Sequence, residues 1–272
     1  MSYVAPPDAE VSRAKPFAAS AAAPDAIIEA RNLTRLFHGF AAVSDVSLRV
    51  QRHTIHALIG PNGAGKTTMF NLITKFLQPS AGTIFFNGQD ITRLRPEEVA
   101  RRGLVRSFQI SAVYPRMSVL ENVRISLQRP TGWSYRFWQS EASLKTLDAR
   151  AAELIERVGL SPWINRPAAQ LSYGRKRALE IATTLALDPE MLLLDEPTSG
   201  MGHEDVDRIA ALIREVSANR TVLMVEHNLS VVSQLSDRIT VLAAGKVLAE
   251  GNYAEVSTDP RVIEAYIGGS DD

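Results

Sequence analysis

Residues 60–67 read GPNGAGKT and match the pattern GxxxxGK[ST]. Glycines let backbone N–H groups turn inward around a phosphate, because no Cβ atom obstructs them. In this pattern Lys66 reaches the β- and γ-phosphates of a nucleotide, and the hydroxyl of Thr67 binds Mg²⁺. The residues assigned to nucleotide binding by the pattern and its first following position are Gly60, Pro61, Asn62, Gly63, Ala64, Gly65, Lys66, Thr67 and Thr68.

The segments on either side of this motif have the periodicity of a strand and a helix. Residues 54–59 form a short apolar run typical of a buried strand, and Phe70, Ile73 and Leu77 recur at helical spacing afterwards. A strand, a glycine-rich turn and a helix N-terminus together form the anion site of a P-loop. The context therefore favours a nucleotide-binding loop over a chance glycine turn before a helix.

Two carboxylates, Asp195 and Glu196, follow the apolar run of residues 192–194. The first suits the shell of a Mg²⁺ ion, and the second suits a base that polarises water against the γ-phosphate. Both stand at the carboxyl end of an expected strand, where α/β sheets bind ligands. The alternative, an acidic strand end that caps the next helix, explains one carboxylate better than two.

The remaining periodicity predicts an α/β fold. Strands are expected at residues 26–30, 44–50, 82–86, 191–194 and 221–225. The first two have the pattern of antiparallel strands. The last two are continuously apolar and are separated by a helix, which indicates a parallel sheet covered on both faces.

A helical segment over about 112–178 is expected to interrupt this α/β core. It begins with a capping box at residues 118–121 and includes a longer helix that stops at Gly159. Residues 1–26 are rich in Ala and Pro without a sustained period, so we expect a disordered tail there. The expected domain therefore covers residues 27–272.

The composition limits the class of protein. The chain has 272 residues, of which 45% are hydrophobic, so it is large enough for one α/β domain with a substantial core. Lys plus Arg and Asp plus Glu number 30 each, and we therefore expect no nucleic-acid partner. The sequence contains no cysteine, which excludes disulfides and thiolate metal sites.

The sequence contains no run of 18 or more apolar residues that would span a bilayer. Charged residues interrupt the segment in which a signal peptide would need an apolar region, namely Asp8, Glu10, Arg13 and Lys15. We therefore expect a cytoplasmic protein that relies on other chains for any membrane-spanning part.

A third motif makes the chain resemble a known family. It consists of Leu171, Ser172, Tyr173, Gly174 and Arg175. Together with GPNGAGKT and LLLDEP, in this order, it is similar to the signature of the ATPase subunit of an ABC transporter. The resemblance implies a P-loop NTPase fold with a RecA-like parallel-sheet core, an antiparallel β subdomain and an inserted helical subdomain. It also implies ATP and Mg²⁺ as cofactors.

The resemblance implies a role for each matching residue. Phe37 would stack on the adenine, whose flat face suits an aromatic ring. The implied catalytic residues are Glu196 as general base, His227 as a contact to the γ-phosphate, and Gln109. The implied Mg²⁺ ligands are Thr67, Gln109 and Asp195, the last through a water molecule. A lone histidine is more often structural, but His227 follows an expected buried strand as the family pattern requires.

In the resembled family two subunits face each other head to tail. Residues 171–175 of one chain would then contact the ATP that Lys66 of the other chain holds. A second ATPase subunit, identical or different, is therefore an implied partner. Hydrolysis would require this dimer, which would open once the γ-phosphate leaves.

Two positions depart from the family pattern. Arg175 stands where Gln or Glu is usual, and with Lys176 and Arg177 it places three cations in the first turn of a helix. This costs roughly 0.3–1 kcal/mol per charge against the helix dipole, unless an anion lies nearby. A bound anion and a solvated basic face remain equally good explanations. Gly202 stands where the family usually carries an Asp or Asn that crosses the dimer interface.

Softer similarities indicate the importer group that includes branched-chain amino-acid, urea and amide transporters. They lie in residues 105–109, 117–123 and 259–268 and in the aromatic insert 133–138. The insert would face a permease or serve as a hydrophobic staple for the next helix. The implied partners are integral membrane permease subunits and, indirectly, a periplasmic solute-binding protein, with this chain at the cytoplasmic face of the inner membrane. The sequence does not name the solute.

Three other functions remain to be weighed. A soluble ABC-type ATPase acting on nucleic acid or ribosomes is disfavoured by the single ATPase unit and zero net charge. A nucleotide-binding regulator without turnover is disfavoured by the presence of all three implied catalytic residues, while Arg175 and Gly202 keep it open. A GTPase is disfavoured because the chain has no Asn-Lys-x-Asp sequence.

Overall fold

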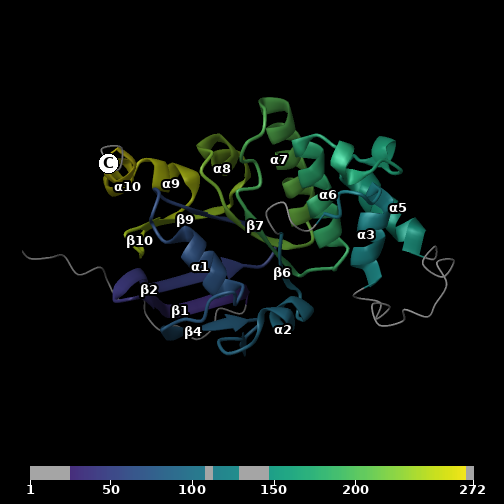
Figure 1. Ribbon diagram of the computed structural model, residues 1–272. Coiled ribbons are helices and arrows are strands. Elements are labelled where there is room, and N and C mark those ends of the chain that lie inside the picture. The colour runs from purple at the N-terminus through teal and green to yellow at the C-terminus, as the bar shows by residue number, and fades with distance from the viewer. Residues whose placement is uncertain (1–24, 108–112, 129–146, 268–272) are drawn as a thin grey trace, which may run out of the picture.

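The computed structural model describes residues 25–107, 113–128 and 147–267 (Figure 1). The expected N-terminal tail up to residue 24, Gln109 and the aromatic insert 133–138 lie outside these ranges. The described chain forms two sheets with helices around them, as the alternation of strands and helices predicts.

A six-stranded sheet forms the centre, in the order β10-β9-β3-β8-β7-β6. The five strands from β9 to β6 are parallel, and β10 pairs antiparallel with β9. The strands are β3 (Ile55–Ile59), β6 (Leu104–Arg106), β7 (Met191–Asp195), β8 (Thr221–Val225), β9 (Arg238–Ala243) and β10 (Lys246–Gly251). Every residue of β3, β7 and β8 is buried, which confirms the parallel sheet that their apolar runs predict.

A second, antiparallel sheet has the order β2-β1-β4-β5. Its strands are β1 (Ala26–Phe37), β2 (Phe40–Gln51), β4 (Ala81–Phe86) and β5 (Gln89–Asp90). The Asn87-Gly88 turn between β4 and β5 has positive φ at both positions, as an Asn-Gly hairpin requires. The strands are longer than expected, because their pairing continues to the hairpin at His38-Gly39.

The helices cover both faces of the central sheet. They are α1 (Lys66–Ile73), α2 (Pro96–Arg101), α3 (Val119–Gln128), α5 (Asp148–Arg157), α6 (Tyr173–Leu185), α7 (His203–Ser217), α8 (Leu229–Leu235), α9 (Tyr253–Ser257) and α10 (Pro260–Ile267). Figure 1 shows α3, α5 and α6 grouped at one end of the molecule, and the antiparallel sheet below α1.

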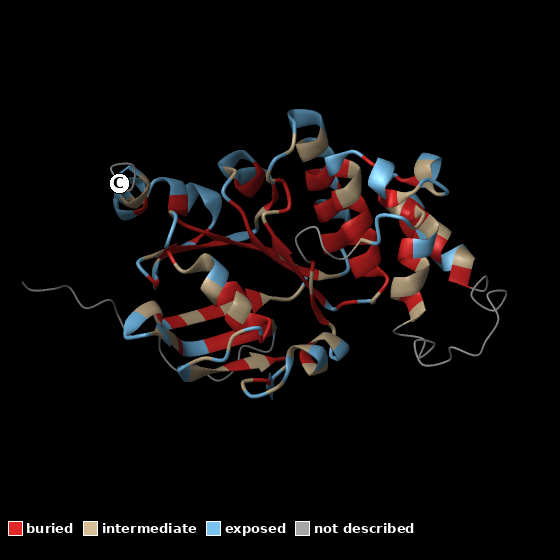
Figure 2. Ribbon diagram, in the orientation of Figure 1, coloured by how far each residue is buried: buried red, intermediate tan, exposed pale blue. Residues whose placement is uncertain are grey.

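Two apolar clusters follow from this layering, and Figure 2 shows them as the red interior of the fold. One joins the antiparallel sheet and α1 to one face of the central sheet, and the other joins α3, α5, α6, α7 and α8 to the opposite face. We call the cluster that contains α3, α5, α6, α7 and α8 the helical cluster. Leu192 and Leu194 of β7 belong to it, whereas Leu193 belongs to the cluster of the antiparallel sheet. The central strand is therefore fixed from both sides.

Local end signals place most helix boundaries correctly. The predicted capping box at α3 is present, because Ser118 and Glu121 exchange side chain to backbone hydrogen bonds of 2.7 and 3.2 Å. Gly159, at φ 70°, follows the last turn of α5. The expected continuation of α1 to Leu77 is wrong. The helix ends at Ile73, and Lys75 takes a left-handed φ of 66° that stops its propagation.

The interior of the central sheet contains one polar ring, His56 on β3. It is fully buried, and its Nε2 lies 2.8 Å from the hydroxyl of Thr240 on β9. Burial lowers the pKa of His56 to about 3, with a smaller contribution from the charge of Arg238. His56 is therefore neutral in the folded protein at neutral and mildly acidic pH.

This burial predicts a loss of stability in mild acid. Between the folded pKa and the unfolded value near 6.5, only the unfolded chain binds the proton, so the free energy of unfolding falls as the pH falls below 6.5. From pH 7.5 to pH 5.5 His56 should cost about 1.4 kcal/mol of stability. Urea unfolding of wild type and His56→Gln at the two pH values measures this difference. Equal pH dependence in both proteins would contradict it.

Candidate functional site

The loop after β3 forms a cradle that only glycine permits. Gly60, Gly63 and Gly65 have φ values of 147°, 75° and 98°. A Cβ atom at Gly60 would lie 2.1 Å from the carbonyl oxygen of Leu242, and one at Gly65 would lie 2.5 Å from that of Ala42. No side chain caps the N-terminus of α1, which begins at Lys66. Its first backbone N–H groups therefore remain available to an anion.

The Lys66 ammonium lies over this cradle. Its Nζ donates hydrogen bonds of 2.7 and 2.9 Å to the carbonyl oxygens of Gly60 and Pro61. Burial lowers the pKa of Lys66, and the charge of Glu196 opposes this shift. The ammonium is thus held by neutral carbonyls at the place where phosphate oxygens would give it stronger, charge-assisted bonds.

Glu196 and His227 meet at the carboxyl ends of two neighbouring strands. β7 and β8 pair up to Asp195 and Val225, and the N–H of Glu196 then donates to the carbonyl of Val225 over 2.9 Å. Nδ1 of His227 lies 3.9 Å from Oε1 of Glu196. Glu196 has a left-handed φ of 44°, which is uncommon for a residue with a side chain. Such local strain is typical of a residue whose side chain must point in a set direction.

A buried carboxylate, Glu226, connects the two loops that carry these side chains. Its Oε1 accepts the N–H groups of His227 and Asn228 over 3.0 and 3.1 Å, and its Oε2 accepts the hydroxyl of Thr198 over 2.8 Å. Oε2 also accepts the N–H of Thr198 over 3.4 Å, so four hydrogen bonds satisfy a carboxylate that is 0% exposed. Glu226 was not among the expected site residues, although its position directly after a buried strand was a signal in the sequence.

Asp195 is held by an arginine from a different strand. Nη2 of Arg106, the last residue of β6, donates to Oδ2 of Asp195 over 2.5 Å. Nη1 of the same guanidinium donates to Oδ1 of Asn71 on α1 over 2.6 Å. The expected metal carboxylate is therefore neutralised by an ion pair, which the sequence did not reveal.

The oxygen donors at this edge fit Mg²⁺. Thr67, at the start of α1, has an exposed side chain, and Asp195 supplies a carboxylate. No group of three or more ligating side chains occurs in the described part of the chain. Mg²⁺ usually keeps several waters and is bound through one or two carboxylates plus phosphates, so a hydroxyl and one carboxylate suit it. Gln109, the third expected ligand, lies outside the described residues.

A second arginine holds the backbone at the same strand end. Arg177 on α6 is buried, and its Nη2 donates to the carbonyl of Asp195 over 2.6 Å and to that of Glu196 over 3.4 Å. Its Nη1 forms a 2.6 Å ion pair with Glu180, also buried. Residues 175–177 were expected to form a solvated basic face or to bind an anion. Arg177 does neither, because it is buried and binds Glu180 and the backbone of β7.

The signature motif starts α6. The Ser172 hydroxyl caps the helix by accepting the N–H of Arg175, and Leu171 is buried in the helical cluster. A Cβ atom at Gly174 would lie 2.5 Å from the side-chain carboxylate of Asp205, which would have to shift to admit it. Tyr173 is 47% exposed. Arg175 stacks on Trp163, with 3.9 Å between the guanidinium carbon and the ring centroid.

The signature does not complete the phosphate cradle of its own chain. The cradle follows β3, whereas the signature helix leads to β7, and β8 lies between these two strands. Among the residues the structure describes, no hydrogen bond or ion pair joins residues 171–175 to residues 60–67. The motif is therefore presented to a different molecule or to solvent.

The aromatic residue expected to contact adenine lies at the β1–β2 hairpin. Phe37 is half-buried, and the guanidinium of Arg35 lies 4.7 Å from its ring centroid. Its cross-strand partner Phe40, which the sequence analysis missed, is 70% exposed. β2 continues from this hairpin to the P-loop. There the carbonyl oxygen of Ala42 lies so close to Gly65 that a Cβ atom at Gly65 would be 2.5 Å from it. The hairpin thus presents two aromatic rings close to the cradle.

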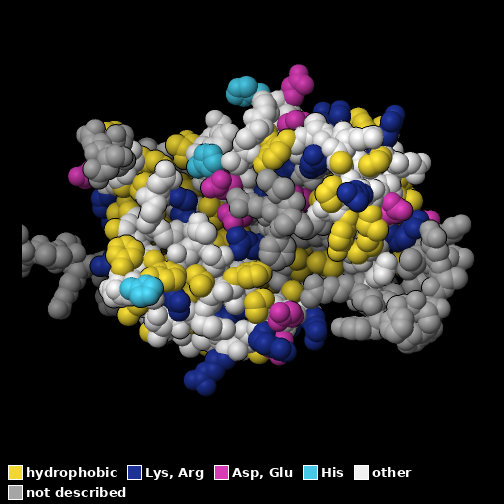
Figure 3. All heavy atoms as spheres, viewed as in Figure 1, with side chains coloured by type: hydrophobic (Ala, Val, Ile, Leu, Met, Phe, Trp, Pro, Cys, Tyr) yellow, Lys and Arg dark blue, Asp and Glu magenta, His cyan; other side chains and the backbone are white. Residues whose placement is uncertain are grey.

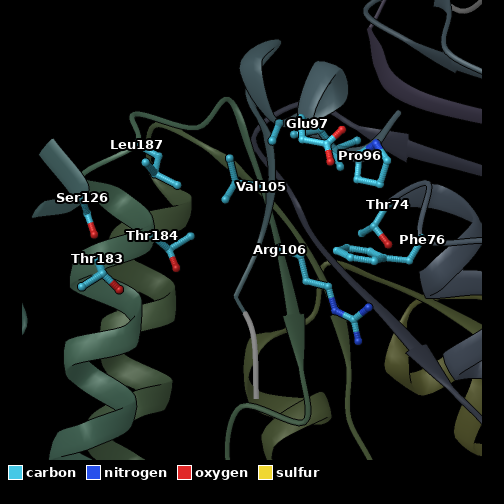
Figure 4. Close-up of a pocket in the computed structure, with 12 residues that line it drawn as sticks. Thr74, Phe76, Pro96, Glu97, Val105, Arg106, Ser126, Thr183, Thr184 and Leu187 are labelled. Carbon is cyan, nitrogen blue, oxygen red and sulfur yellow. The ribbon is translucent and has the colours of Figure 1, made fainter. Parts of the chain in front are cut away.

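A cavity of about 390 Å³ opens beside β6 (Figure 4). The segment after α1 and helix α2 line one side of it, and α3 and α6 line the other. Phe76, Arg106, Ser126 and Thr184 are among the residues that line it. Arg106 lines the cavity and also binds Asp195. Its side chain therefore lies between the cavity and the carboxylate expected to serve the metal.

Two family models match this chain. The model described as "ABC transporter" matches residues 43–199, and that described as "Branched-chain amino acid ATP-binding cassette transporter" matches residues 246–272. The first range contains the cradle, the signature and Glu196, and the second contains the C-terminal helix α10.

Curated relatives and solved structures agree. The chain is 40% identical to the high-affinity branched-chain amino acid transport ATP-binding protein LivG of Escherichia coli K12, and 37% identical to BraF of Pseudomonas aeruginosa. Each match covers 89% of this chain and 98% of the relative. A solved ATP-binding cassette of an ABC transporter, in its ADP conformation, is 30% identical with a TM-score of 0.78 and covers 89% of this chain and 99% of its own. The chain therefore belongs to the ABC transporter family and is one of its nucleotide-binding, ATP-hydrolysing proteins.

Proposed function

We propose that this chain powers a membrane importer of branched-chain amino acids or related small polar solutes such as urea and amides. The observation that carries the proposal is the meeting of Lys66, Glu196 and His227 at one edge of the parallel sheet, next to a glycine cradle. The relatives named for branched-chain amino-acid transport support the solute class and favour transport over a soluble ATPase or a regulator.

The geometry divides the work of hydrolysis among the residues of this chain. The free N–H groups of the cradle and the Lys66 ammonium bind the phosphates of ATP. Glu196, whose backbone is left-handed and whose carboxylate lies 3.9 Å from His227, accepts a proton from the attacking water. His227, held by Glu226, donates a hydrogen bond to the γ-phosphate. Phe37 and Phe40 offer faces for the adenine ring.

Thr67 and Asp195 would hold Mg²⁺ together with the phosphates, and Gln109 would join them. The ion would neutralise the charge that develops on the transferred phosphoryl group. Asp195 would act through a water molecule, because its carboxylate is already engaged by Arg106. Thr67 is exposed at the first turn of α1, so its hydroxyl oxygen is available as a metal ligand.

The signature motif supports a head-to-tail dimer. Ser172, Tyr173 and Gly174 lie at a helix N-terminus that is not used by the cradle of the same chain. A second ATPase subunit, of this or another chain, would place its ATP against this N-terminus. Arg175 would lie at the edge of that contact, steadied by Trp163.

The proposal includes integral membrane permease subunits, a periplasmic solute-binding protein acting through them, and a peripheral position at the cytoplasmic face of the inner membrane. None of the helices within the described ranges is both long and apolar enough to cross a bilayer. On the face in Figure 3, basic and acidic side chains are interspersed, which does not favour nucleic acid.

Replacing the base tests the hydrolysis. Glu196→Gln should bind ATP as wild type does and should lower turnover by a factor of about 10²–10⁴, because the amide cannot accept the proton. Phosphate release measures turnover, and calorimetry measures binding. Glu264→Gln, which changes an exposed carboxylate on α10, is the matched control and should keep full turnover. Wild-type turnover in Glu196→Gln would remove Glu196 as the base.

The same variant tests the dimer. Without turnover, Glu196→Gln with ATP and Mg²⁺ should accumulate as a dimer whose mass light scattering reports. A monomer under these conditions would mean that the second ATPase subunit is a different chain or that the head-to-tail arrangement is wrong.

Replacing the cradle lysine tests nucleotide binding. Lys66→Ala removes the charged donor that phosphate oxygens would engage, so the affinity for ATP should fall by about tenfold or more, since a hydrogen bond to a charged group contributes roughly 1.5–3 kcal/mol. Calorimetric titration measures the affinity, and an unchanged thermal midpoint shows that the fold is kept. Normal affinity would contradict the role of the loop.

A tagged pull-down from detergent-solubilised membranes tests the partners. Co-purification of multi-span permease chains, with or without a second ATPase, supports the importer, and the binding protein that feeds those permeases identifies the solute. Recovery from the soluble fraction without integral membrane chains would contradict the transport proposal.

A further inference from the structure

The segment that follows β8 contacts the phosphate cradle at two points. β9 and β10 form a hairpin next to β3, and α9 and α10 pack against this hairpin (Figure 1). The N–H of Gly245, in the hairpin turn, donates to the carbonyl of Ala64 over 3.0 Å. The backbone of Leu242 lies so close to Gly60 that a Cβ atom there would be 2.1 Å from its carbonyl oxygen. The cradle is therefore built against this later part of the chain.

Tyr266 brings α10 to the first residue of the cradle. Its ring packs against the helical cluster, which also contains Ile59, the residue before Gly60. Its hydroxyl is buried and has no well-formed hydrogen bond within the described residues. Burial raises the pKa of Tyr266, and an interaction with the backbone of Gly60 opposes this rise. The hydroxyl is therefore close to Gly60 but does not yet form a full hydrogen bond with it.

The direction of this interaction identifies the backbone group of Gly60 that faces the hydroxyl. A group that lowers the pKa of a phenol favours the charged form and is therefore a hydrogen-bond donor. The backbone of Gly60 has one donor, its N–H. In the part of the chain that the structure describes, this N–H donates to no other backbone group. A donor and an acceptor thus lie near each other, and neither has a better partner there.

We propose that Tyr266 positions the cradle for nucleotide, because its hydroxyl oxygen accepts the N–H of Gly60 when phosphate binds. In this structure Lys66 holds Gly60 instead, through a 2.7 Å hydrogen bond from its ammonium to the Gly60 carbonyl. Phosphate oxygens draw the ammonium away from this carbonyl, since they offer it charge-assisted bonds. The bond from Gly60 to Tyr266 then replaces the lost one. This inference rests on the proposed role of the cradle and adds a positioning residue to it.

The conformational freedom of glycine explains why Gly60 needs such a bond. Gly60 has a φ of 147°, which is one of many conformations open to a residue without a side chain. Nucleotide requires one of these conformations, so the entropy lost in fixing Gly60 weakens binding. A hydrogen bond that favours the required conformation reduces this loss and strengthens binding.

The first experiment separates nucleotide affinity from stability. Calorimetric titration with ADP and Mg²⁺ measures binding by the full chain without turnover. Tyr266→Phe keeps the ring and removes the hydroxyl, so the affinity for ADP should fall by about twofold to tenfold, the effect of one neutral hydrogen bond. The thermal midpoint without nucleotide should stay the same or rise, because the lost hydroxyl is buried without a well-formed hydrogen bond among the described residues. A hydroxyl with a purely structural role would leave the affinity for ADP unchanged.

Tyr253→Phe is the matched control. Tyr253 is the first residue of α9, the neighbouring helix of the same segment, and is 37% exposed. This variant also loses only a phenolic hydroxyl, so its affinity for ADP and its thermal midpoint should equal those of wild type. Unchanged affinity in a folded Tyr266→Phe protein would overturn the inference, and so would an equal loss of affinity in both variants.

The second experiment observes the Gly60 amide itself by nuclear magnetic resonance. Isoleucine labelled with ¹³C at its carbonyl and glycine labelled with ¹⁵N select the amides of Ile–Gly pairs, which the sequence contains at residues 59–60 and 267–268. Gly268→Ala removes the second signal and so assigns the first. With saturating ADP and Mg²⁺, the Gly60 amide should exchange with deuterated solvent about twofold or more slowly in wild type than in Tyr266→Phe, because only wild type offers it the phenolic acceptor.

The outcomes separate this inference from the proposed function. A wild-type chain that binds no ADP would contradict the role of the cradle itself. Normal binding by wild type, with the same Gly60 exchange rate in wild type and Tyr266→Phe, would overturn the bond to Tyr266 alone. Weaker ADP binding in Tyr266→Phe, together with faster exchange at Gly60, would support Tyr266 as a positioning residue.

Discussion

The carboxyl end of β7 is the point on which the site depends, and two arginines from different parts of the chain hold it. Arg106 of β6 binds the carboxylate of Asp195, and Arg177 of α6 binds the carbonyl of the same residue. A strand end normally has unpaired carbonyls that water satisfies. Here buried, charge-assisted hydrogen bonds replace that water, so Asp195 and Glu196 are fixed relative to both the cavity and the signature helix.

The sequence predicted what depends on local patterns. The cradle at residues 60–67 is read from glycine spacing, and the buried strands β7 and β8 are read from apolar runs, because burial on both faces of a sheet leaves a one-dimensional signal. The capping box of α3 is local as well. The end of α1 was missed, since the left-handed turn at Lys75 depends on packing beyond the helix.

Long-range contacts were not predictable from one sequence. Arg106 and Asp195 are separated by 89 positions, and Glu226 reaches Thr198 across 28 positions. For Arg177 a solvated basic face and a bound anion were equally good expectations. Its partner Glu180 is local, three residues further along α6, but its second partner, the Asp195 carbonyl, is reached only when α6 packs on β7. An ion pair between distant positions has no period or spacing, so pattern analysis cannot identify it.

In the proposed dimer, the same contacts would let the two sites communicate although Gly202 has no side chain to cross the interface. Within one chain, Gly174 packs against Asp205 of α7, the Tyr173 ring lies beside Gly200, and Arg177 binds the backbone of Asp195 and Glu196. In the proposed dimer the signature contacts the partner's ATP, while Glu196 serves the chain's own ATP. A displacement of the signature by the partner's nucleotide would therefore move the chain's own base directly. Coupling through a buried guanidinium and close backbone packing needs no side chain at position 202.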